Sequence, residues 1–361
     1  MGRLKGQVNP EFWKGKRVFL TGHSGFKGSW TSLWLQYLGA NVKGYSLEPP
    51  TKPSLFVEAN VGENMISEFE NINDFSTLEK SMKSFNPDIL IHMAAQPLVR
   101  LSYENPLETY MTNVIGTANV LQSARLCSNL KSIVSITTDK CYENKEWSWG
   151  YRENEPMGGH DPYSSSKGCA ELVTSAYRRS FFNTNNTPFL ASARAGNVIG
   201  GGDWATDRLI PDILKAFEKE KIVTVRNPLS TRPWQHVLEP ISGYLVLAEM
   251  LYDYGEDYAE GWNFGPKDED CKSVEWILEK MTQKWGKGAN WKLDSQNNPH
   301  EAGFLKLDCS KAAQKLNWFP QWNLEQTLDL IINWQQNWLS GSNMKSQCLK
   351  EIINYQNYSN E

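Results

Sequence analysis

The chain has 361 residues and a formal net charge of −4 at pH 7, with acidic and basic residues mixed along its length. This length suits one large α/β unit with a second lobe, because single hydrophobic cores stop growing at roughly 250 to 300 residues. The sequence has no basic stripe for nucleic acid, no CxxC pair for zinc, no secretory signal and no apolar run of the roughly 18 residues that cross a membrane, so we expect a cytoplasmic protein with no nucleic-acid, membrane or metal partner.

From Lys16 onward, short apolar runs bounded by turn residues alternate with longer stretches of helical periodicity. The periodic stretches at 30–38 and 113–126 predict crossover helices, and the alternation predicts βαβ units. We therefore expect an α/β fold with a Rossmann-type doubly wound parallel sheet. The predicted strands are RVFLTG (17–22), NVKGYSL (41–47), PDILIHMAA (87–95), KSIVSITT (131–138) and PFLASARAG (188–196).

After Gly196 the sequence becomes rich in Gly and Pro and the regular alternation ends. This change predicts a dinucleotide-binding Rossmann domain at 14–196, to which 237–262 returns, and a smaller mixed α/β substrate lobe at 197–236 and 263–345. The irregular segment 141–162 is too long for a simple connection and is the type of loop that carries function. The polar residues after Gly341 are expected to form a loosely held tail.

Three glycines follow the first predicted strand and open a helix: Gly22, Gly25 and Gly28. Glycines in this context let the backbone approach a pyrophosphate, whose charge the helix N-terminus meets, and a plain tight turn is the alternative. The acidic residue expected to hold the ribose hydroxyls is replaced by Ser46, with Glu48 two residues later. Since no Arg or Lys follows at once to accept a 2′-phosphate, we expect NAD, with the preference over NADP left open.

Tyr163 and Lys167 are four residues apart and share one face of a predicted helix. A phenol acts as a base near neutrality only if its pKa of about 10 is lowered, and a neighbouring ammonium and a positive nicotinamide would lower it. A chance surface pair is the alternative, which the glycine-rich βα turn upstream disfavours. Thr138 and Asp139 stand at the end of the fourth predicted strand, where Asp139 acts either in catalysis or as a helix cap.

These motifs resemble the extended short-chain dehydrogenase/reductase family, over about 16–338. Within that family the chain is most similar to the branch that dehydrates CDP-glucose, and this resemblance, not composition or spacing, implies CDP-glucose as the substrate. The matching blocks are HMAAQPLVRLSYENP, TTDKCYENKEWSWGYRENEPMGGHDPYSSSKGCAEL, RAGNVIGGGDWATDRLIPDI, RPWQHVLEP and GWNFGPKDED.

The resemblance also implies the roles of the catalytic residues. Thr138 polarises the C4 oxygen of the sugar, Asp139 is the acid for the departing C6 hydroxyl, and Tyr163 with Lys167 serves the C4 oxidation. Lys140 stands where most related dehydratases have Glu. It would take the C5 proton if its pKa were depressed, or stabilise the enolate as a cation, and the sequence leaves both roles open.

The residues expected around the two ligands follow from the same resemblance. Arginines suit the diphosphate because their planar fork matches phosphate oxygens, although each alone is more typical of a solvated surface. The expected cofactor-binding residues are Gly22, Ser24, Gly25, Phe26, Lys27, Gly28, Asn71, Ile72, Ala94, Ala95, Gln96, Asn113, Tyr163 and Lys167. The expected substrate-binding residues are Thr138, Asn197, Arg208, Arg232 and His300.

A homodimer is implied as well, through the helix with Tyr163 and the helix at 113–126. Two other functions remain as alternatives, a nucleotide-sugar 4-epimerase and a non-catalytic regulator that binds NAD. The acid Asp139 favours a dehydratase, and the intact Tyr163–Lys167 pair disfavours the regulator. The residues expected at the dimer interface are Val114, Ala118, Leu121, Ala170, Val173 and Tyr177.

Overall fold

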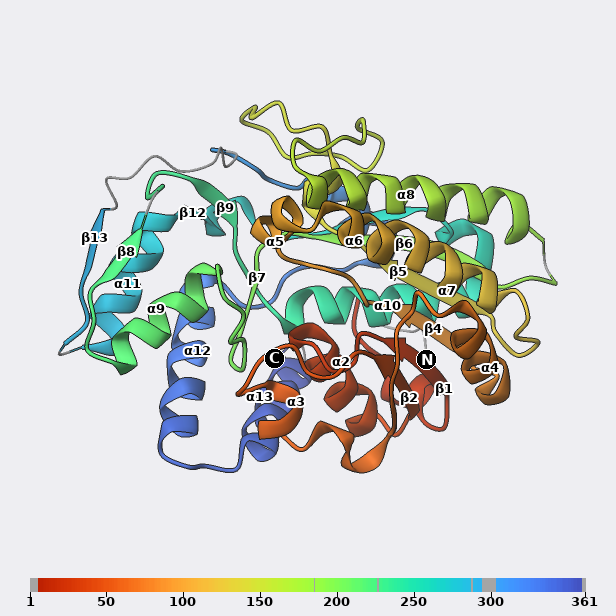
Figure 1. Cartoon of the computed structure of the whole chain (residues 1–361), viewed down its shortest axis with the longest axis horizontal. Coiled ribbons are helices and arrows are strands. Elements are labelled where there is room, and N and C mark those ends of the chain that lie inside the picture. Colours follow the sequence, from red (N-terminus) through yellow and green to blue (C-terminus); the bar gives the residue numbers. More distant parts are fainter. Residues whose placement is uncertain (1–5, 185, 226, 287, 294–302, 359–361) are drawn as a thin grey trace.

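The computed structural model describes residues 6–184, 186–225, 227–286, 288–293 and 303–358. A seven-stranded, all-parallel sheet runs through the molecule in the order β11-β6-β5-β4-β1-β2-β3 (Figure 1). The order reverses between β4 and β1, and this confirms the predicted Rossmann-type fold. The strands are β1 (Arg17–Thr21), β2 (Asn41–Ser46), β3 (Ile66–Phe69), β4 (Ile89–His92), β5 (Ser132–Ile136), β6 (Phe189–Ala195) and β11 (Gly261–Phe264).

Helices cover both faces of this sheet. Successive residues of β1 show why, because Val18 and Leu20 belong to one core cluster and Phe19 to the other. A strand buried on both faces reads as a continuous apolar run, as the sequence suggested. One face packs on α2 (Phe26–Tyr37), α10 (Leu238–Tyr254) and α13 (Met344–Tyr358), and the other on α4 (Phe75–Phe85), α7 (Gly116–Ala124) and α8 (Pro162–Phe181).

The structure confirms the five predicted strands and shifts the two predicted helices. α2 begins at Phe26, four residues before the periodic stretch, and α7 follows a π-helical turn, η2 (Met111–Ile115). The edge strand β3 was not predicted. It has only four residues, and Ile66 and Phe69 at its ends are exposed, so it lacks the apolar run of a buried strand.

Residues after β6 also build a second core beside the sheet, at the left of Figure 1. It combines three helices with short strand pairs, and Ile213, Phe217, Leu278, Leu328 and Ile331 lie at its centre. Its elements are β7 (Val198–Ile199) with β10 (Gln235–His236), β9 (Thr231–Pro233) with β12 (Cys271–Ser273), β8 (Val223–Val225) with β13 (Trp291–Leu293), α9 (Leu209–Glu218), α11 (Val274–Trp285) and α12 (Leu324–Leu339).

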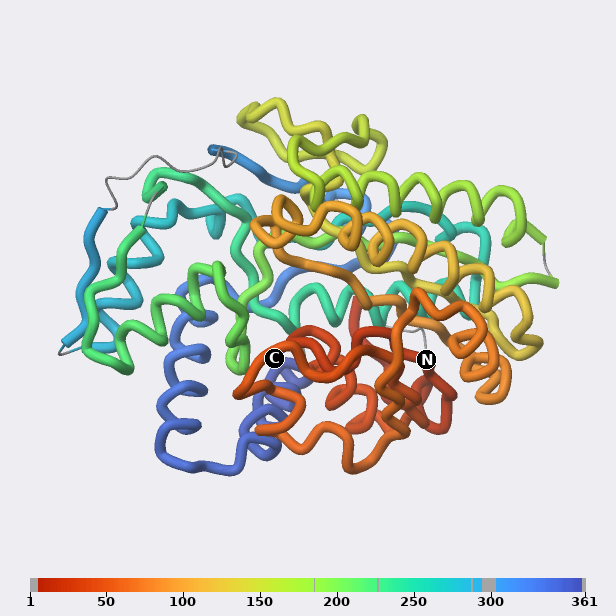
Figure 2. Tube along the Cα trace, in the orientation of Figure 1, coloured from red at the N-terminus to blue at the C-terminus, as the bar shows by residue number. Residues whose placement is uncertain are grey.

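The C-terminal residues are not the loose tail that their polarity suggested. They form α13, which packs against α2, so that C-terminal (blue) and N-terminal (red) segments lie side by side in Figure 2. Met344, Cys348, Ile352 and Tyr355 recur at helical spacing and are all buried in the main core. The expectation was wrong because this narrow apolar stripe lies between polar residues.

The remaining elements are short connections around the sheet and the second core. No helix within the described part of the chain has the length and apolarity needed to cross a bilayer. The short connecting elements are α1 (Pro10–Trp13), α3 (Leu55–Glu58), η1 (Val61–Asn64), α5 (Val99–Glu104), α6 (Pro106–Tyr110), η3 (Asp139–Cys141), η4 (Gly255–Tyr258), η5 (Asp268–Asp270) and η6 (Ala312–Leu316).

Candidate active site

Most of the predicted site residues follow the carboxyl ends of the parallel strands. β1 leads into 22–28, β4 into 94–96, β5 into 138–140, and β6 into Asn197. In a doubly wound sheet the carboxyl ends form one edge, and the crevice opens where the strand order reverses. Segments far apart in the sequence are therefore gathered along one edge of the sheet.

The loop after β1 has backbone geometry that requires glycine. Gly22 has a φ of +79°, and a Cβ there would lie 2.7 Å from the backbone nitrogen of Ala94. A Cβ on Gly28 would lie 2.0 Å from the carbonyl oxygen of Gly22. Gly25 is the N-cap of α2 and has no side chain to cap it. This cradle, open at a helix N-terminus, fits a pyrophosphate.

Ser46 ends β2 where an acidic residue was expected. Its Oγ lies 3.0 Å from Nδ1 of His23 and 2.8 Å from Oγ of Ser24, which donates to the carbonyl oxygen of Leu47 at 2.7 Å. Burial lowers the pKa of His23 to about 4, so its ring is neutral. Glu48 is exposed. The β2 end and the glycine loop are thus joined by uncharged hydrogen bonds.

The turn after β5 brings Thr138 and Asp139 to the Tyr163 side chain of α8. Thr138 Oγ1 donates to Asp139 Oδ1 at 2.9 Å, and its side chain is also hydrogen-bonded to the Tyr163 phenol. Burial raises the pKa of Tyr163 to about 12, although the Thr138 hydrogen bond acts in the opposite direction. Burial of the almost completely enclosed phenol thus opposes the lowering expected from Lys167 and a bound nicotinamide.

Several basic side chains lie around Tyr163 and Lys167. Burial lowers the pKa of Lys167 to about 8, with the Glu171 charge opposing it. The pKa of Lys27 falls to about 7, first by burial and then by the charges of Lys167 and Arg208. The Arg208 charge also acts on Tyr163. Lys27 and Arg208 therefore belong to the same electrostatic environment as the Tyr–Lys pair.

Asp139 is the buried acid of this site. Burial raises its pKa, against the lowering effects of Lys140, the Thr138 hydrogen bond and Arg232. Its Oδ2 has no hydrogen-bond partner among the described residues, and a Cβ on Gly196 would lie 2.3 Å from that oxygen. A carboxyl with a raised pKa retains its proton at higher pH, as a general acid must. The contacts disfavour a simple helix-cap role.

Apart from Thr138, the predicted substrate residues within the described part of the chain come from the second core and its connections. Arg208 precedes α9, and its Nη1 lies 2.8 Å from Asp203 Oδ2. Arg232 lies on β9, close enough for its charge to act on Asp139. Asn197 is partly buried between β6 and β7. His300 lies outside the described residues.

Two predicted cofactor residues are engaged within the protein. Buried Asn113 accepts from the backbone nitrogen of Gln96 at 2.9 Å and donates to Ser166 Oγ at 2.8 Å, which ties the loop after β4 to α8. Gln96 itself donates to Thr109. Ile72 is buried, while Asn71 is exposed.

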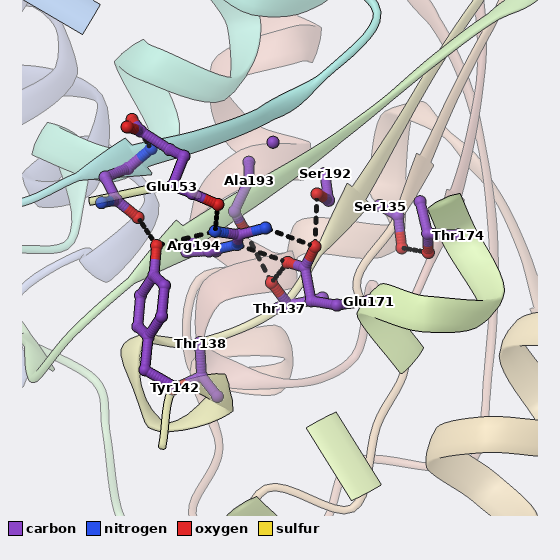
Figure 3. Close-up of polar contacts among 12 residues, drawn as sticks. Ser135, Thr137, Thr138, Tyr142, Glu153, Glu171, Thr174, Ser192, Ala193 and Arg194 are labelled. Atoms are coloured by element: carbon purple, nitrogen blue, oxygen red, sulfur yellow. Dashed lines mark hydrogen bonds and ion pairs between the residues drawn. The ribbon is translucent and has the colours of Figure 1, made fainter. Parts of the chain in front are cut away.

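Sequence reasoning missed a buried ion pair behind the site, Glu171 with Arg194 (Figure 3). Two signals were visible. Glu171 continues the four-residue spacing of Tyr163 and Lys167, and Arg194 is the one charged residue of a mainly apolar strand, where a buried charge needs a partner. Over the described ranges, no cluster of three or more His, Cys, Asp or Glu side chains could hold a metal ion.

The comparisons with known proteins show that the chain belongs with nucleotide-sugar dehydratases. The model of the family described as GDP-mannose 4,6 dehydratase matches residues 19–331, and the chain belongs to this family. A curated CDP-glucose 4,6-dehydratase of Salmonella typhimurium is 58% identical over 352 residues, which cover 96% of this chain and 98% of the relative. The dTDP-glucose 4,6-dehydratase of Haemophilus influenzae is 24% identical, over 88% of this chain and 97% of the relative.

Solved structures agree on the fold. A UDP-glucose 4-epimerase of Thermotoga maritima superposes with a TM-score of 0.77 at 22% identity, covering 90% of this chain and 99% of that one. A dTDP-glucose 4,6-dehydratase of Bacillus anthracis, in complex with NAD, has a TM-score of 0.74 at 20% identity, covering 92% of this chain and 100% of that one.

Proposed function

We propose that this protein is an NAD-dependent CDP-glucose 4,6-dehydratase, which converts CDP-glucose to CDP-4-keto-6-deoxy-glucose and so supplies a deoxysugar for surface polysaccharide. The observation that carries the proposal is the 58% identity to a CDP-glucose 4,6-dehydratase over almost the whole of both chains. The assembly of Thr138, Asp139, Tyr163 and Lys167 at one edge of the sheet supports it.

NAD, when bound, would accept a hydride from C4 of the sugar and return it at C6. The glycine cradle at 22–28 would hold its pyrophosphate, because a side chain at Gly22 or Gly28 would strike backbone atoms there. Lys167, on the Tyr163 face of α8, would contact the cofactor. The segments at 71–72 and 94–96, which follow β3 and β4 at the same carboxyl edge of the sheet, would line the rest of the site.

Tyr163 would take the proton of the C4 hydroxyl as that carbon becomes a ketone. In the protein alone its pKa is about 12, because burial outweighs the lowering effects of Thr138 and Arg208, so the positive nicotinamide would have to lower it on binding. Thr138, already hydrogen-bonded to the phenol, would hold the C4 oxygen beside it.

Elimination would follow from the acidity of C5 next to the new ketone. Asp139 would donate its proton to the C6 oxygen, the C6–O bond would break, and water would leave as the C5 proton departs. Its raised pKa supports this role. Lys140, one residue on and partly buried, would take the C5 proton or stabilise the enolate.

The nucleotide and diphosphate of the substrate would be bound by Arg208, Arg232, Asn197 and His300. We propose 197–236 and 263–345 as the lobe that carries them, and 14–196 with 237–262 as the dinucleotide-binding domain. The charges of Arg208 and Arg232, which act on Tyr163 and Asp139, support a diphosphate between the two regions. A cytoplasmic location stays a prediction from the sequence.

The function is tested by incubating the protein with NAD and CDP-glucose, and in parallel with UDP-glucose and dTDP-glucose. A 4-keto-6-deoxy product, detected by its alkaline absorbance, is expected from CDP-glucose. Formation of CDP-galactose without that product would identify a 4-epimerase, and no turnover of any sugar nucleotide would favour a regulator.

A homodimer is the further expectation. Leu107, Met111, Ile115 and Leu172 are exposed on α6, η2 and α8, which pack side by side. Exposed apolar side chains grouped on neighbouring helices are typical of an interface. The interface residues expected from the sequence need correction, because Leu121 and Ala170 are buried within their own chain. Sedimentation of a stable monomer at micromolar concentration would contradict the dimer.

A further inference from the structure

The buried ion pair behind the active site has two good hydrogen bonds. Nε of Arg194 lies 2.8 Å from Oε1 of Glu171, and Nη2 lies 2.8 Å from Oε2. The side chains are only 5% and 4% exposed. A buried charge pair of this kind is costly to break, since removing one partner leaves the other charge without compensation. The geometry of the pair is therefore strongly fixed.

Both ends of the loop that carries the catalytic triplet, Thr138, Asp139 and Lys140, are bonded to this pair, as Figure 3 shows. We call residues 137–142 the triplet loop. At its start, Thr137 Oγ1 donates to the Glu171 carboxylate. At its end, the Tyr142 hydroxyl accepts from Arg194 Nη1 at 2.7 Å, and the guanidinium lies 5.1 Å from the Tyr142 ring. The residues between these two anchors are Thr138, Asp139, Lys140 and Cys141.

The same pair is attached to the helix that carries the Tyr–Lys pair. Glu171 follows Lys167 by four residues and Tyr163 by eight, so the three side chains share a face of α8. Ser192 on β6 also donates to Glu171, at 2.7 Å. One carboxylate therefore links α8, β6 and the triplet loop.

We propose that Glu171 and Arg194 form the positioning element of the active site, which holds Thr138 and Asp139 in register with Tyr163 and Lys167. The inference rests on the proposed function, because that reaction needs both groups on one sugar ring. Proton transfer depends on reacting atoms within hydrogen-bond distance, and a misplacement of about 1 Å lowers rates by roughly 100-fold.

The test separates positioning from plain stabilisation with two matched variants. Thr137→Val removes the hydroxyl that joins the triplet loop to Glu171 and leaves the ion pair intact. Thr174→Val is the control, because Thr174 Oγ1 bonds Ser135 Oγ at 3.4 Å between the same helix and sheet, away from the loop. Thr137→Ser keeps the hydroxyl and should restore the wild-type behaviour.

For CDP-glucose turnover, we expect Thr137→Val to lower kcat by roughly 10- to 100-fold with KM changed less than about threefold. Thr174→Val should keep kcat within about twofold of the wild type. It should lower the melting temperature by about as much as Thr137→Val does. Equal kcat in the two valine variants, or a Thr137→Ser variant as slow as Thr137→Val, would overturn the proposal.

Hydrogen exchange gives a readout that needs no turnover. The backbone amides of 138–142 should exchange at least about tenfold faster in Thr137→Val than in Thr174→Val or the wild type. Unchanged exchange would overturn the positioning role. If the wild-type protein fails to convert CDP-glucose, the proposed function fails, and this exchange comparison still decides whether the pair fixes the loop.

Discussion

Glu171 and Glu351 are both almost completely buried, one behind the active-site edge of the sheet and one in the C-terminal helix. Burial raises the pKa of Glu171, but the charge and hydrogen bonds of Arg194 outweigh it and hold the pKa below its usual value. Burial raises the pKa of Glu351 to about 8, with only Gln347 and Lys350 opposing it. Equal burial thus gives an ionised carboxylate in one region and a protonated one in the other.

This difference between the two carboxylates reflects different roles of the two regions. The region around α8 concentrates charges whose positions serve chemistry, and the region around α13 buries apolar side chains and uncharged polar groups that serve stability. Substitutions in the first region should change turnover more than stability, and those in the second should do the reverse.

The largest expected effect is that of Tyr163→Phe. It removes the proton acceptor for the C4 hydroxyl while conserving the ring, so kcat should fall by at least roughly 10²- to 10⁴-fold with little change in melting temperature. Steady-state turnover of CDP-glucose and a thermal scan measure both. Turnover near the wild-type level would remove Tyr163 from the mechanism.

In the second region, Ile352→Ala should destabilise the protein by about 2–5 kcal/mol, because Ile352 is fully buried and its loss leaves a cavity. Its kcat, measured well below the melting temperature, should match the wild type. The exposed Lys350 on the same helix provides the control, and Lys350→Ala should change stability by less than about 0.5 kcal/mol. A loss of kcat without loss of stability in Ile352→Ala would erase the distinction between the regions.

How much of each region the sequence predicts depends on how far apart in the sequence the interacting residues lie. The strands, the glycine loop and the Tyr163–Lys167 pair are local patterns, so short stretches indicated them. The Glu171–Arg194 pair joins residues 23 positions apart, and only the fold brings them together. The raised pKa of Tyr163 arises from enclosure by several elements, which no local pattern reveals. The apolar stripe of α13 is local, but it is narrow and lies between polar residues, so the polarity of the segment concealed it.

Substitutions of Lys140 test which residue takes the C5 proton in the first region, the one around α8. We expect it to be the C5 base, so that Lys140→Glu, which restores a carboxylate base, retains roughly 10- to 100-fold more exchange of the C5 proton than Lys140→Met. Lys140→Met should still allow hydride transfer from C4. Deuterium incorporation at C5 in heavy water measures the exchange. More exchange in the Met variant would mean that Lys140 is a cation that stabilises the enolate, because Glu would put negative charge beside the oxyanion.

The smallest expected effect is the part of the pH dependence of stability that arises from Glu351 alone. A carboxyl with a folded-state pKa near 8 and an unfolded value of 4.5 binds more protons when folded across that window, so its contribution to stability falls as pH rises. His236 Nε2 lies 3.7 Å from the carboxylate, but burial lowers the pKa of His236 to about 3, so the neutral ring does not compensate.

Glu351→Gln mimics the protonated carboxyl and cannot titrate, and the difference between variant and wild type cancels the other titrating groups. From pH 6 to pH 7 the variant should gain about 1.4 kcal/mol relative to the wild type, the equivalent of one proton. Urea unfolding at each pH measures this difference. A difference that stays the same between pH 6 and pH 7 would mean that Glu351 is already ionised at pH 6, and the two carboxylates would then differ only in their partners, Arg194 and His236.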